Sequence, residues 1–446
     1  MIRFLYNLLF PLVLLVFLPG YVVKMLRRGN YRNKFGQRLG FYDLETRARL
    51  ARGPRTWLHA VSVGEVMIGL KLAAAMKQQE PELKVALTTT TTTGFALAGR
   101  HPESWIEVLY SPLDFWPIMR RAFNLIRPSR IILVEAEIWP NLTALAEARK
   151  IPLALVNARL SPRSERRFRR FLLFVRPYFR KLDLLCVQEP ADRARWQSLG
   201  VDHRRIQLVG SIKFDLENVS SNPERPRAFL ADLGLAPERP ILLAGSTHPG
   251  EEEILGRTLL QLRQQFPDLF LIIAPRHVER AREIEQQLQT LGLSSARRSP
   301  GGKAQTDCLL LDTTGELPDW YGVATVVFIG KSLTAKGGQN PVEAIIAERP
   351  VVFGPHMENF AALTATLLLR GGAVQVQDEL SLTNELRELF RDRSRRQRLT
   401  IAAREVLAPH HGATARTAAL LEKLAPQTSG KTLATPLHAP DIARPS

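Results

Sequence analysis

Two apolar runs in the first half of the chain each end in a carboxylate. The stretch "HAVSVGEV", residues 59–66, leads from a buried-strand pattern through a glycine to Glu65, where a helical pattern begins. The stretch "IILVEAEIWPN", residues 131–141, places Glu135 in the same position after another apolar run. An acid held at such a turn in a cleft can act as a general base. Each could equally be a charge that complements a helix dipole, and the residues alone leave both interpretations open.

The second half carries residue types that suit a nucleotide. Glycine turns followed by helical patterns present backbone N–H groups and a positive dipole end to phosphate. Arg276, in "LIIAPRH", has a guanidinium fork that can clamp a phosphate. Glu343 follows Asn340 at a predicted helix start, where it can accept hydrogen bonds from ribose hydroxyls. The sequence has no P-loop, no strand-linked G-x-G-x-x-G and no D-x-D, so protein cations and helix dipoles are expected to stabilise a leaving nucleoside phosphate.

For these side chains to act together, the fold must bring the ends of several strands to one place. Short continuous apolar runs alternate with helical patterns twice along the chain, which is typical of parallel sheets covered on both faces. The predicted strands are 56–62, 84–90, 131–135, 152–157, 184–188 and 206–209, then 241–245, 269–274, 308–312, 325–329 and 350–353. The sequence therefore predicts two doubly wound α/β domains, 24–215 and 228–424, with a linker at 216–227 and a cleft between them. Ligands are expected beyond the carboxyl ends of the strands.

The two ends of the chain differ from this body. Residues 1–23 are almost wholly apolar, and cations begin at Lys24. The length suits a membrane span of about 20 residues, and the position of the cations predicts a cytoplasmic body. A monotopic insertion bent at Pro11 and a buried core helix are the alternatives. The composition of residues 425–446 predicts a disordered tail.

The charge of the chain favours anionic partners. The formal net charge is +18, and residues 159–181 combine nine Lys/Arg with five aromatic side chains. A basic amphipathic helix with an aromatic face suits an anionic membrane surface. A solvated face with a core-packing stripe is the alternative, and both can hold together. A membrane-tethered nucleic-acid-binding protein is a rival interpretation of the charge, but no recognised nucleic-acid-binding motif accompanies it.

At these residues the sequence resembles the 3-deoxy-D-manno-octulosonic acid (Kdo) transferases of lipid A assembly. The resemblance runs from the N-terminus to about residue 420 and is carried by motifs in the family's order: "FGQRLGFY", "SVGE", "EAEIWPN", "NARLS", "GSIKFD", "GSTHPGEE", "PRH", "GEL", "GGQNPVE" and "FGPHMENF". It implies a GT-B fold, in which two Rossmann-like domains flank a cleft. It also implies transfer of Kdo from CMP-Kdo to a tetraacyl lipid A precursor, with inversion and without a bound metal or other cofactor.

The resemblance also implies roles for single residues. The Glu of "SVGE", here Glu65, would be the general base, while Glu135 and Lys213 would support the transition state. CMP contacts would fall on Pro275, Arg276, Thr314, Gly315, Glu316, Asn340, Pro341, Val342 and Glu343. The apolar N-terminus and the basic surfaces predict a place on the cytoplasmic face of the cell inner membrane, with anionic lipids as partners, and no nucleic acid is expected as a partner.

Three residues depart from the family pattern. Lys331 and Gln339 stand where Gly and His are expected, and Gln37 stands where many members have Glu. The departures leave the proposed base intact but bear on the donor loop and on donor choice. A GT-B glycosyltransferase with another nucleotide sugar and another membrane acceptor is therefore a second interpretation.

Overall fold

The computed structural model describes residues 2–28, 34–100, 103–135, 138–160, 162–215, 222–299 and 306–424. They form two compact units. The first contains the residues up to Ile212 together with those from Ala413, and the second contains Lys213–Gly412. The predicted tail, 425–446, and half of the predicted linker, residues 216–221, lie outside the described residues.

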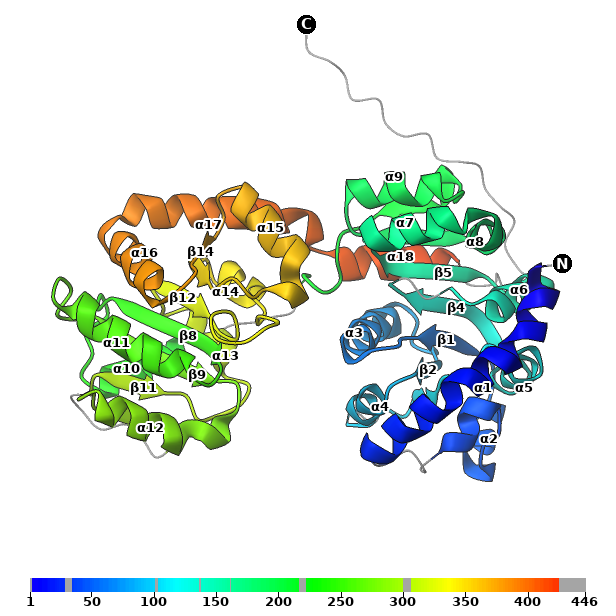
Figure 1. The fold of residues 1–446 in the computed structure, drawn as a ribbon, viewed down its shortest axis with the longest axis horizontal. Coiled ribbons are helices and arrows are strands. Elements are labelled where there is room, and N and C mark those ends of the chain that lie inside the picture. Colours follow the sequence, from blue (N-terminus) through cyan, green and yellow to red (C-terminus); the bar gives the residue numbers. More distant parts are fainter. Residues whose placement is uncertain are drawn as a thin grey trace, which may run out of the picture. The chain divides into compact units, whose positions relative to one another are not determined.

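The first unit is built on a seven-stranded parallel sheet with the order β3-β2-β1-β4-β5-β6-β7 (Figure 1). Its strands are β1 (Arg55–His59), β2 (Val85–Thr89), β3 (Ile106–Tyr110), β4 (Pro128–Val134), β5 (Leu153–Ala158), β6 (Leu184–Val187) and β7 (Ile206–Leu208). Its helices are α1 (Ile2–Arg28), α2 (Leu44–Ala51), α3 (Val63–Gln79), α4 (Thr92–Gly99), α5 (Trp116–Ile126), α6 (Pro140–Ala148), α7 (Pro162–Arg170), α8 (Leu172–Phe179), α9 (Pro190–Ser198) and α18 (Ala413–Lys423), with short 3-10 turns at Phe35–Leu39 and His203–Arg205. One face of the sheet packs on α3, α4 and α18, and the other on α2, α5, α6, α8 and α9.

The second unit repeats this plan with the strand order β10-β11-β9-β8-β12-β13-β14, again all parallel. Its strands are β8 (Ile241–Thr247), β9 (Phe270–Pro275), β10 (Ser295–Arg297), β11 (Cys308–Leu310), β12 (Val326–Ile329), β13 (Val351–Phe353) and β14 (Val374–Gln375). Its helices are α10 (Glu224–Asp232), α11 (Glu251–Arg263), α12 (Ala281–Thr290), α13 (Leu317–Tyr321), α14 (Val342–Ile346), α15 (Ala361–Leu369), α16 (Glu379–Arg391) and α17 (Arg393–Leu407), with 3-10 turns at Val278–Arg280, Glu358–Phe360 and Ala408–His410. The prediction of two parallel, doubly wound α/β units is confirmed.

The last helix crosses the boundary that the sequence suggested. Residues up to 424 were expected in the second domain, yet α18 packs in the first unit, where Ala418 and Leu421 are buried in the core beside α3. The guanidinium of Arg130, itself buried, donates to the Leu421 carbonyl at 2.7 Å. Burial of this apolar face and of its backbone group explains the assignment. In addition, α10 begins at Glu224, inside the range predicted as linker.

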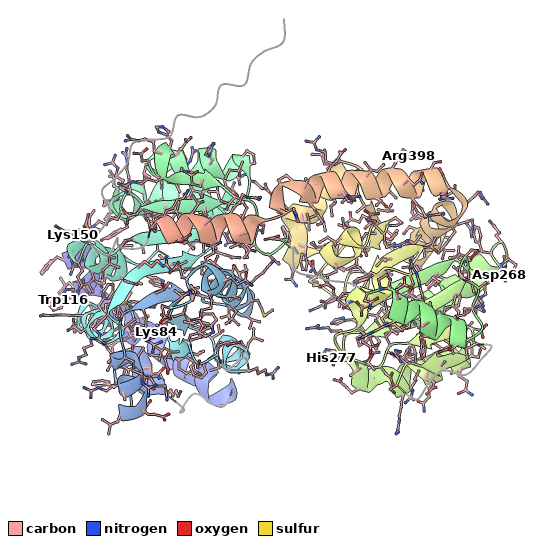
Figure 2. All side chains as sticks on the ribbon, turned by 180° about the vertical axis from the view of Figure 1, so that it is seen from behind. Lys84, Trp116, Lys150, Asp268, His277 and Arg398 are labelled. Carbon is pink, nitrogen blue, oxygen red and sulfur yellow. The ribbon has the colours of Figure 1, made fainter. Side chains whose placement is uncertain are left out.

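The N-terminal helix α1 lies along the first unit beside α5 and α6 (Figure 1). The Asn7 amide donates to Asn141 Oδ1 at 2.9 Å and its oxygen accepts from the Trp116 N–H at 3.1 Å. The Phe10 ring stacks on Phe115 with centroids 5.6 Å apart. Trp116 itself points outward at the start of α5 (Figure 2). These contacts give α1 an inner face that is occupied by protein.

The outer face of α1 is apolar and exposed. Phe4, Leu8, Leu12, Leu15 and Val16 recur at helical spacing and each leaves more than half of its surface exposed, from 58% to 75%. Within the described ranges, no helix combines the length and the apolarity that a membrane crossing needs. The span predicted over residues 1–23 is therefore not confirmed.

Candidate functional site

Glu65 sits in the first turn of α3, directly beyond the carboxyl end of β1. Ser62 caps the helix, because its hydroxyl accepts from the Glu65 N–H at 3.3 Å and donates to Glu65 Oε1 at 2.9 Å. The other carboxylate oxygen accepts from the Val61 N–H at 2.8 Å. This is the helix-capping geometry that was the alternative to a catalytic role. It also fixes a half-buried carboxylate at the strand end, and each carboxylate oxygen has a second lone pair, so the two roles are compatible.

Glu135 stands beyond the end of the neighbouring strand. β1 and β4 pair in parallel, so the turns that follow them share one edge of the sheet. Glu135 adopts a left-handed backbone conformation with φ 66°, and its N–H donates to the Val156 carbonyl at 2.9 Å. A non-glycine residue held in this region stores strain of order 1–3 kcal/mol, which is typical of functional sites. The structure thus brings the two predicted carboxylates to adjacent strand ends.

Asn157 organises the same edge, and the sequence analysis assigned it no role. It ends β5 in the motif "NARLS", is buried, and has φ 52°. Its side-chain oxygen accepts from the Ile212 N–H at 3.0 Å and lies 3.4 Å from the Ser211 hydroxyl. The ammonium of Lys71 on α3 donates to the Ile212 carbonyl at 3.3 Å. Asn157 and Lys71 therefore fix the segment that leads into Lys213.

Lys213 belongs to the second unit, whereas Glu65 and Glu135 belong to the first. Its ammonium donates to the Asn359 carbonyl at 3.1 Å and lies 4.1 Å from the centroid of the Phe360 ring. Both partners come from the motif "FGPHMENF". A cation over an aromatic ring is held in place by the ring's negative face. These two contacts fix the position of the Lys213 ammonium.

The predicted donor residues lie at the carboxyl ends of the central strands of the second sheet. Pro275 ends β9, and the exposed Arg276 follows it, with its N–H bonded to the Thr247 carbonyl at 3.0 Å. Thr314, Gly315 and Glu316 follow β11, while Asn340, Pro341, Val342 and Glu343 follow β12 and open α14. Since β11, β9, β8 and β12 are consecutive in the sheet, these three segments share one edge. The His277 side chain, next to Arg276, points outward from this unit (Figure 2).

Glu316 and Glu343, the two acidic residues among the predicted CMP contacts, are held by neighbouring side chains. Glu316 accepts from the Thr313 hydroxyl at 3.1 Å and from Arg298 Nε at 3.2 Å. Burial raises the pKa of the Glu343 carboxyl, and a hydrogen bond from Asn340 offsets part of that rise. The side-chain oxygen of Asn340 also accepts from the N–H of Val342, the first residue of α14, at 3.2 Å.

Glu251 is a buried carboxylate that sequence reasoning missed. It opens α11 in the motif "GSTHPGEE" and is fully buried. One oxygen accepts from the N–H groups of His248 and Lys331, at 2.9 and 2.8 Å. The other accepts from those of Ser332 and Leu333, at 2.9 and 3.0 Å. One side chain thus holds the loop after β12 against the turn after β8. The sequence signal for such a residue was the run of three consecutive glutamates in a basic chain.

Two special backbone positions shape the same loop. Lys331, where the resemblance leads one to expect Gly, has φ 57°, and its carbonyl accepts from the Gly338 N–H at 2.9 Å. Gly338 has φ 68°, and a Cβ there would lie 2.4 Å from Met357 Sδ, so only glycine fits. The departure at Lys331 is therefore accommodated by Glu251 and Gly338, which hold its backbone from both sides.

Gln37 and Gln339 are the other two residues that depart from the family pattern. Gln37 is buried and its side-chain oxygen accepts from the Tyr110 N–H at 2.9 Å, which ties the N-terminal 3-10 turn to β3. Gln339 is half-buried. In the part of the chain that the structure describes, no group of three or more His, Cys, Asp or Glu side chains is placed to hold a metal ion.

Comparisons with known proteins agree on one family. A family model described as 3-deoxy-D-manno-octulosonic-acid transferase (kdotransferase) matches residues 33–216. The 3-deoxy-D-manno-octulosonic acid transferase of Haemophilus influenzae is 32% identical over 395 residues, which cover 88% of this chain and 91% of that protein. The enzyme of the same name from Bordetella pertussis is 34% identical over 382 residues, covering 82% and 86%.

Solved structures support the fold. The glycotransferase of kitacinnamycin matches with a TM-score of 0.51 at 15% identity, covering 84% of this chain and 100% of that one. The Anabaena protein HepE, solved in complex with UDP, matches with a TM-score of 0.50 at 14% identity, covering 82% and 99%. At these identities the likeness shows a GT-B-like fold and nothing of the ligands. The relatives, in contrast, share both sequence and length, so this chain belongs to the 3-deoxy-D-manno-octulosonic acid transferase family of glycosyltransferases.

Proposed function

We propose that this glycosyltransferase moves Kdo from CMP-Kdo to a tetraacyl lipid A precursor, with inversion at the anomeric carbon. The observation that carries the proposal is the fixed Glu65 carboxylate beyond β1, with Glu135 beyond the adjacent strand. The donor side is supported by the exposed Arg276 and the loops that share its sheet edge. Family membership supports Kdo as the transferred sugar.

The proposed reaction is one displacement. A sugar hydroxyl of the acceptor loses its proton to a carboxylate oxygen of Glu65 as its oxygen attacks the anomeric carbon of Kdo. The bond from that carbon to the phosphate oxygen breaks, and CMP leaves with the electron pair. Attack from the face opposite CMP inverts the configuration. Arg276 would stabilise the charge on the departing phosphate through charge-assisted hydrogen bonds.

Donor choice is the test that separates this function from its alternative. The purified full chain is incubated with the tetraacyl lipid A precursor and either CMP-Kdo or a panel of UDP-sugars, and nucleotide release is measured. Release of CMP that depends on the acceptor supports the proposal. Release of UDP with no response to CMP-Kdo would favour a glycosyltransferase with another donor.

Removing the Arg276 guanidinium should weaken nucleotide binding. Arg276→Ala loses charge-assisted hydrogen bonds worth roughly 1.5–3 kcal/mol each, so the Kd for CMP should rise by about 10- to 150-fold. Titration calorimetry with CMP measures this directly. Arg282→Ala removes an exposed arginine in the first turns of α12 and serves as the matched control. An Arg276→Ala variant that binds CMP as tightly as the Arg282→Ala control would rule out the phosphate contact.

We also propose that the enzyme works on the cytoplasmic face of the inner membrane, held by the outer face of α1 and by the region of α7 and α8. The predicted single basic helix over 159–181 is two helices that meet at Phe171. Part of its aromatic stripe packs inward, since Phe179 is buried and Phe168 lies against the core. Phe171, Leu173 and Phe174 are exposed. The core-packing interpretation thus accounts for Phe168 and Phe179, and the exposed side chains support the proposal of a membrane surface.

Neutralising arginines of α7 should weaken attachment to anionic lipid. Arg166→Gln with Arg167→Gln should lower partitioning of the full chain onto anionic vesicles by roughly 30-fold, because each cation near the surface contributes about 1 kcal/mol. Co-sedimentation at low salt measures the partitioning. The control pair is Arg393→Gln with Arg398→Gln, two exposed arginines of α17, of which Arg398 is labelled in Figure 2. An equal loss in both pairs would show that net charge, and not the position of α7, governs attachment.

A further inference from the structure

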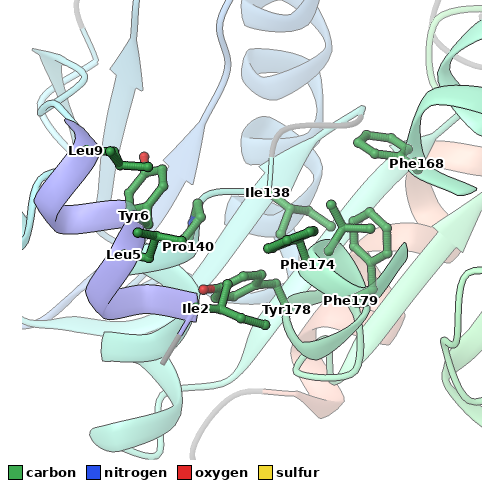
Figure 3. Close-up of a pocket in the computed structure, with 11 residues that line it drawn as sticks. Ile2, Leu5, Tyr6, Leu9, Ile138, Pro140, Phe168, Phe174, Tyr178 and Phe179 are labelled. Carbon is green, nitrogen blue, oxygen red and sulfur yellow. The ribbon is translucent and has the colours of Figure 1, made fainter. Parts of the chain in front are cut away.

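An apolar hollow lies between α1 and α8 in the first unit (Figure 3). It has a volume of about 310 Å³, within the range of small-molecule sites. Ile2, Leu5, Tyr6 and Leu9 of α1 form one wall. The other wall consists of Ile138, Pro140, Phe168, Phe174, Val175, Tyr178 and Phe179. An apolar surface of this kind, open to one side, gains free energy by taking up an apolar ligand.

The polar groups near the hollow are already used by the protein. The Tyr6 hydroxyl is hydrogen-bonded to Asp114, whose carboxylate also accepts from the N–H groups of Asn141 and Leu142, at 2.9 Å each. Burial raises the pKa of the Asp114 carboxyl to about 7. This network fixes α1 at Tyr6 and Asn7 and so fixes one wall of the hollow. The occupant must therefore be recognised by its apolar surface inside the hollow.

A second, more polar hollow adjoins the first. Ile2 and Tyr178 line both, so the two hollows adjoin at the first turn of α1. The second hollow, of about 480 Å³, also contains Arg3, Lys181 and Glu147. Lys181 forms an ion pair with Glu147, and its ammonium lies 5.8 Å from the Tyr178 ring centroid. The hydroxyl of Tyr178 points toward the start of α1 (Figure 3). Two cations and one carboxylate leave this hollow with a net positive charge.

The helices that line the hollow also carry exposed cations and apolar side chains. Helix α7, whose Phe168 lines the hollow, exposes five arginines: Arg163, Arg166, Arg167, Arg169 and Arg170. Helix α8 and the outer face of α1 carry exposed apolar side chains. An apolar cavity, an adjoining cationic hollow and exposed cationic and apolar side chains on the lining helices together match a molecule with a long hydrocarbon chain and an anionic head.

We propose that this composite hollow binds one anionic glycerophospholipid of the membrane, with an acyl chain between α1 and α8 and the phosphate at Arg3 and Lys181. A peptide segment would need partners for its backbone groups, which the apolar hollow lacks. The bound lipid would hold α1 against α8 and seat the first unit at the bilayer surface. The proposal concerns a lipid other than the sugar acceptor, so it does not depend on the proposed acceptor.

The test uses the full chain in mild detergent with a trace of phosphatidylglycerol that carries a diazirine near the end of one acyl chain. After illumination, mass spectrometry maps the adducts. We expect adducts on the lining residues of α1 and α8. Leu5→Trp, which fills part of the hollow, should lower the adduct yield by about tenfold, equivalent to the loss of a modest apolar contact. Leu8→Trp is the control, since Leu8 is on the same helix but lines a different surface hollow.

Two further experiments test which headgroup is bound and which lipid supplies the acyl chain. Replacing the probe by its phosphatidylcholine analogue, or Arg3 by Gln, should lower the yield severalfold, while Arg120→Gln on α5 should not. Circular dichroism checks that each variant is folded. Adducts confined to Leu8 and Leu12, or equal losses in Leu5→Trp and Leu8→Trp, would overturn the proposal. Unlabelled acceptor lipid that displaces the probe, where unlabelled phosphatidylglycerol does not, would assign the hollow to the acceptor and overturn it as well.

Discussion

Replacing Glu65 by Gln should lower the turnover number for Kdo transfer by about 10²–10⁴, the range that positioned general-base catalysis contributes. The amide has nearly the shape of the carboxylate but cannot take the acceptor's proton. It retains one oxygen that can accept from the Val61 N–H or the Ser62 hydroxyl, so α3 keeps part of its cap. The KM for CMP-Kdo should change little, since Glu65 is in the first unit and the donor loops are in the second. Initial rates with saturating donor and acceptor measure the effect.

Ser62→Ala separates the capping role of this turn from its catalytic role. It removes the hydroxyl that caps α3 and should cost about 0.5–2 kcal/mol of stability. The carboxylate of Glu65 remains and keeps its bond to the Val61 N–H. Ser62→Ala should therefore lose stability but keep most of its turnover, whereas Glu65→Gln should lose most of its turnover. If Glu65→Gln turned over within about threefold of the unchanged chain, below the 10²-fold minimum expected of a general base, Glu65 would be only a capping residue.

Replacing Glu251 by Gln should destabilise the second unit by about 2–4 kcal/mol. Both carboxylate oxygens of Glu251 accept from backbone N–H groups. Whichever way the amide of Gln is turned, its NH₂ group faces two of those donors in a fully buried place. Two N–H groups then lose their acceptor. Urea unfolding followed by circular dichroism measures the loss.

Glu253→Gln is the matched control for this change. Glu253 is in the same turn of α11, but its side chain is about half exposed and pairs with Arg257. An exposed pair of this kind contributes only about 0.3–0.5 kcal/mol. Because Glu251 also holds the loop at Lys331, Glu251→Gln should weaken CMP binding and Glu253→Gln should not. Equal stability of the two variants would contradict the role assigned to Glu251.

The sheet framework was predictable because its strands are continuous apolar runs. Every predicted strand, from 56–62 to 350–353, is present in the structure, since a strand buried on both faces needs apolar side chains on both faces. The strands that were missed lack that signal. β3 carries Glu107, which is buried only because Arg49 pairs with it at 2.7 Å, and β14 has two residues. Local composition could not reveal a partner 58 positions away in the chain.

The site was predictable in its strand-end positions but not in its internal supports. Glu65, Glu135 and Arg276 could be picked out because each follows an apolar run. Asn157 and Glu251 were missed, because they accept hydrogen bonds from backbone N–H groups of loops more than 50 residues away and do not follow an apolar run in the same way. The left-handed conformation of Lys331 is likewise imposed by tertiary contacts. The docking of the N-terminal helix was likewise not predictable, since its apolar sequence indicated a span, which is not confirmed, while the contact of Asn7 with Asn141 depends on the tertiary fold.

Mass spectrometry of the lipid product tests the central claim most directly. The full chain and its Glu65→Gln variant are incubated in parallel with CMP-Kdo and the tetraacyl lipid A precursor, and the lipids are weighed. The account predicts a product heavier than the precursor by one or more Kdo residues with the unchanged chain, and almost none with the variant. Unmodified precursor from the unchanged chain, or equal product from both proteins, would contradict it.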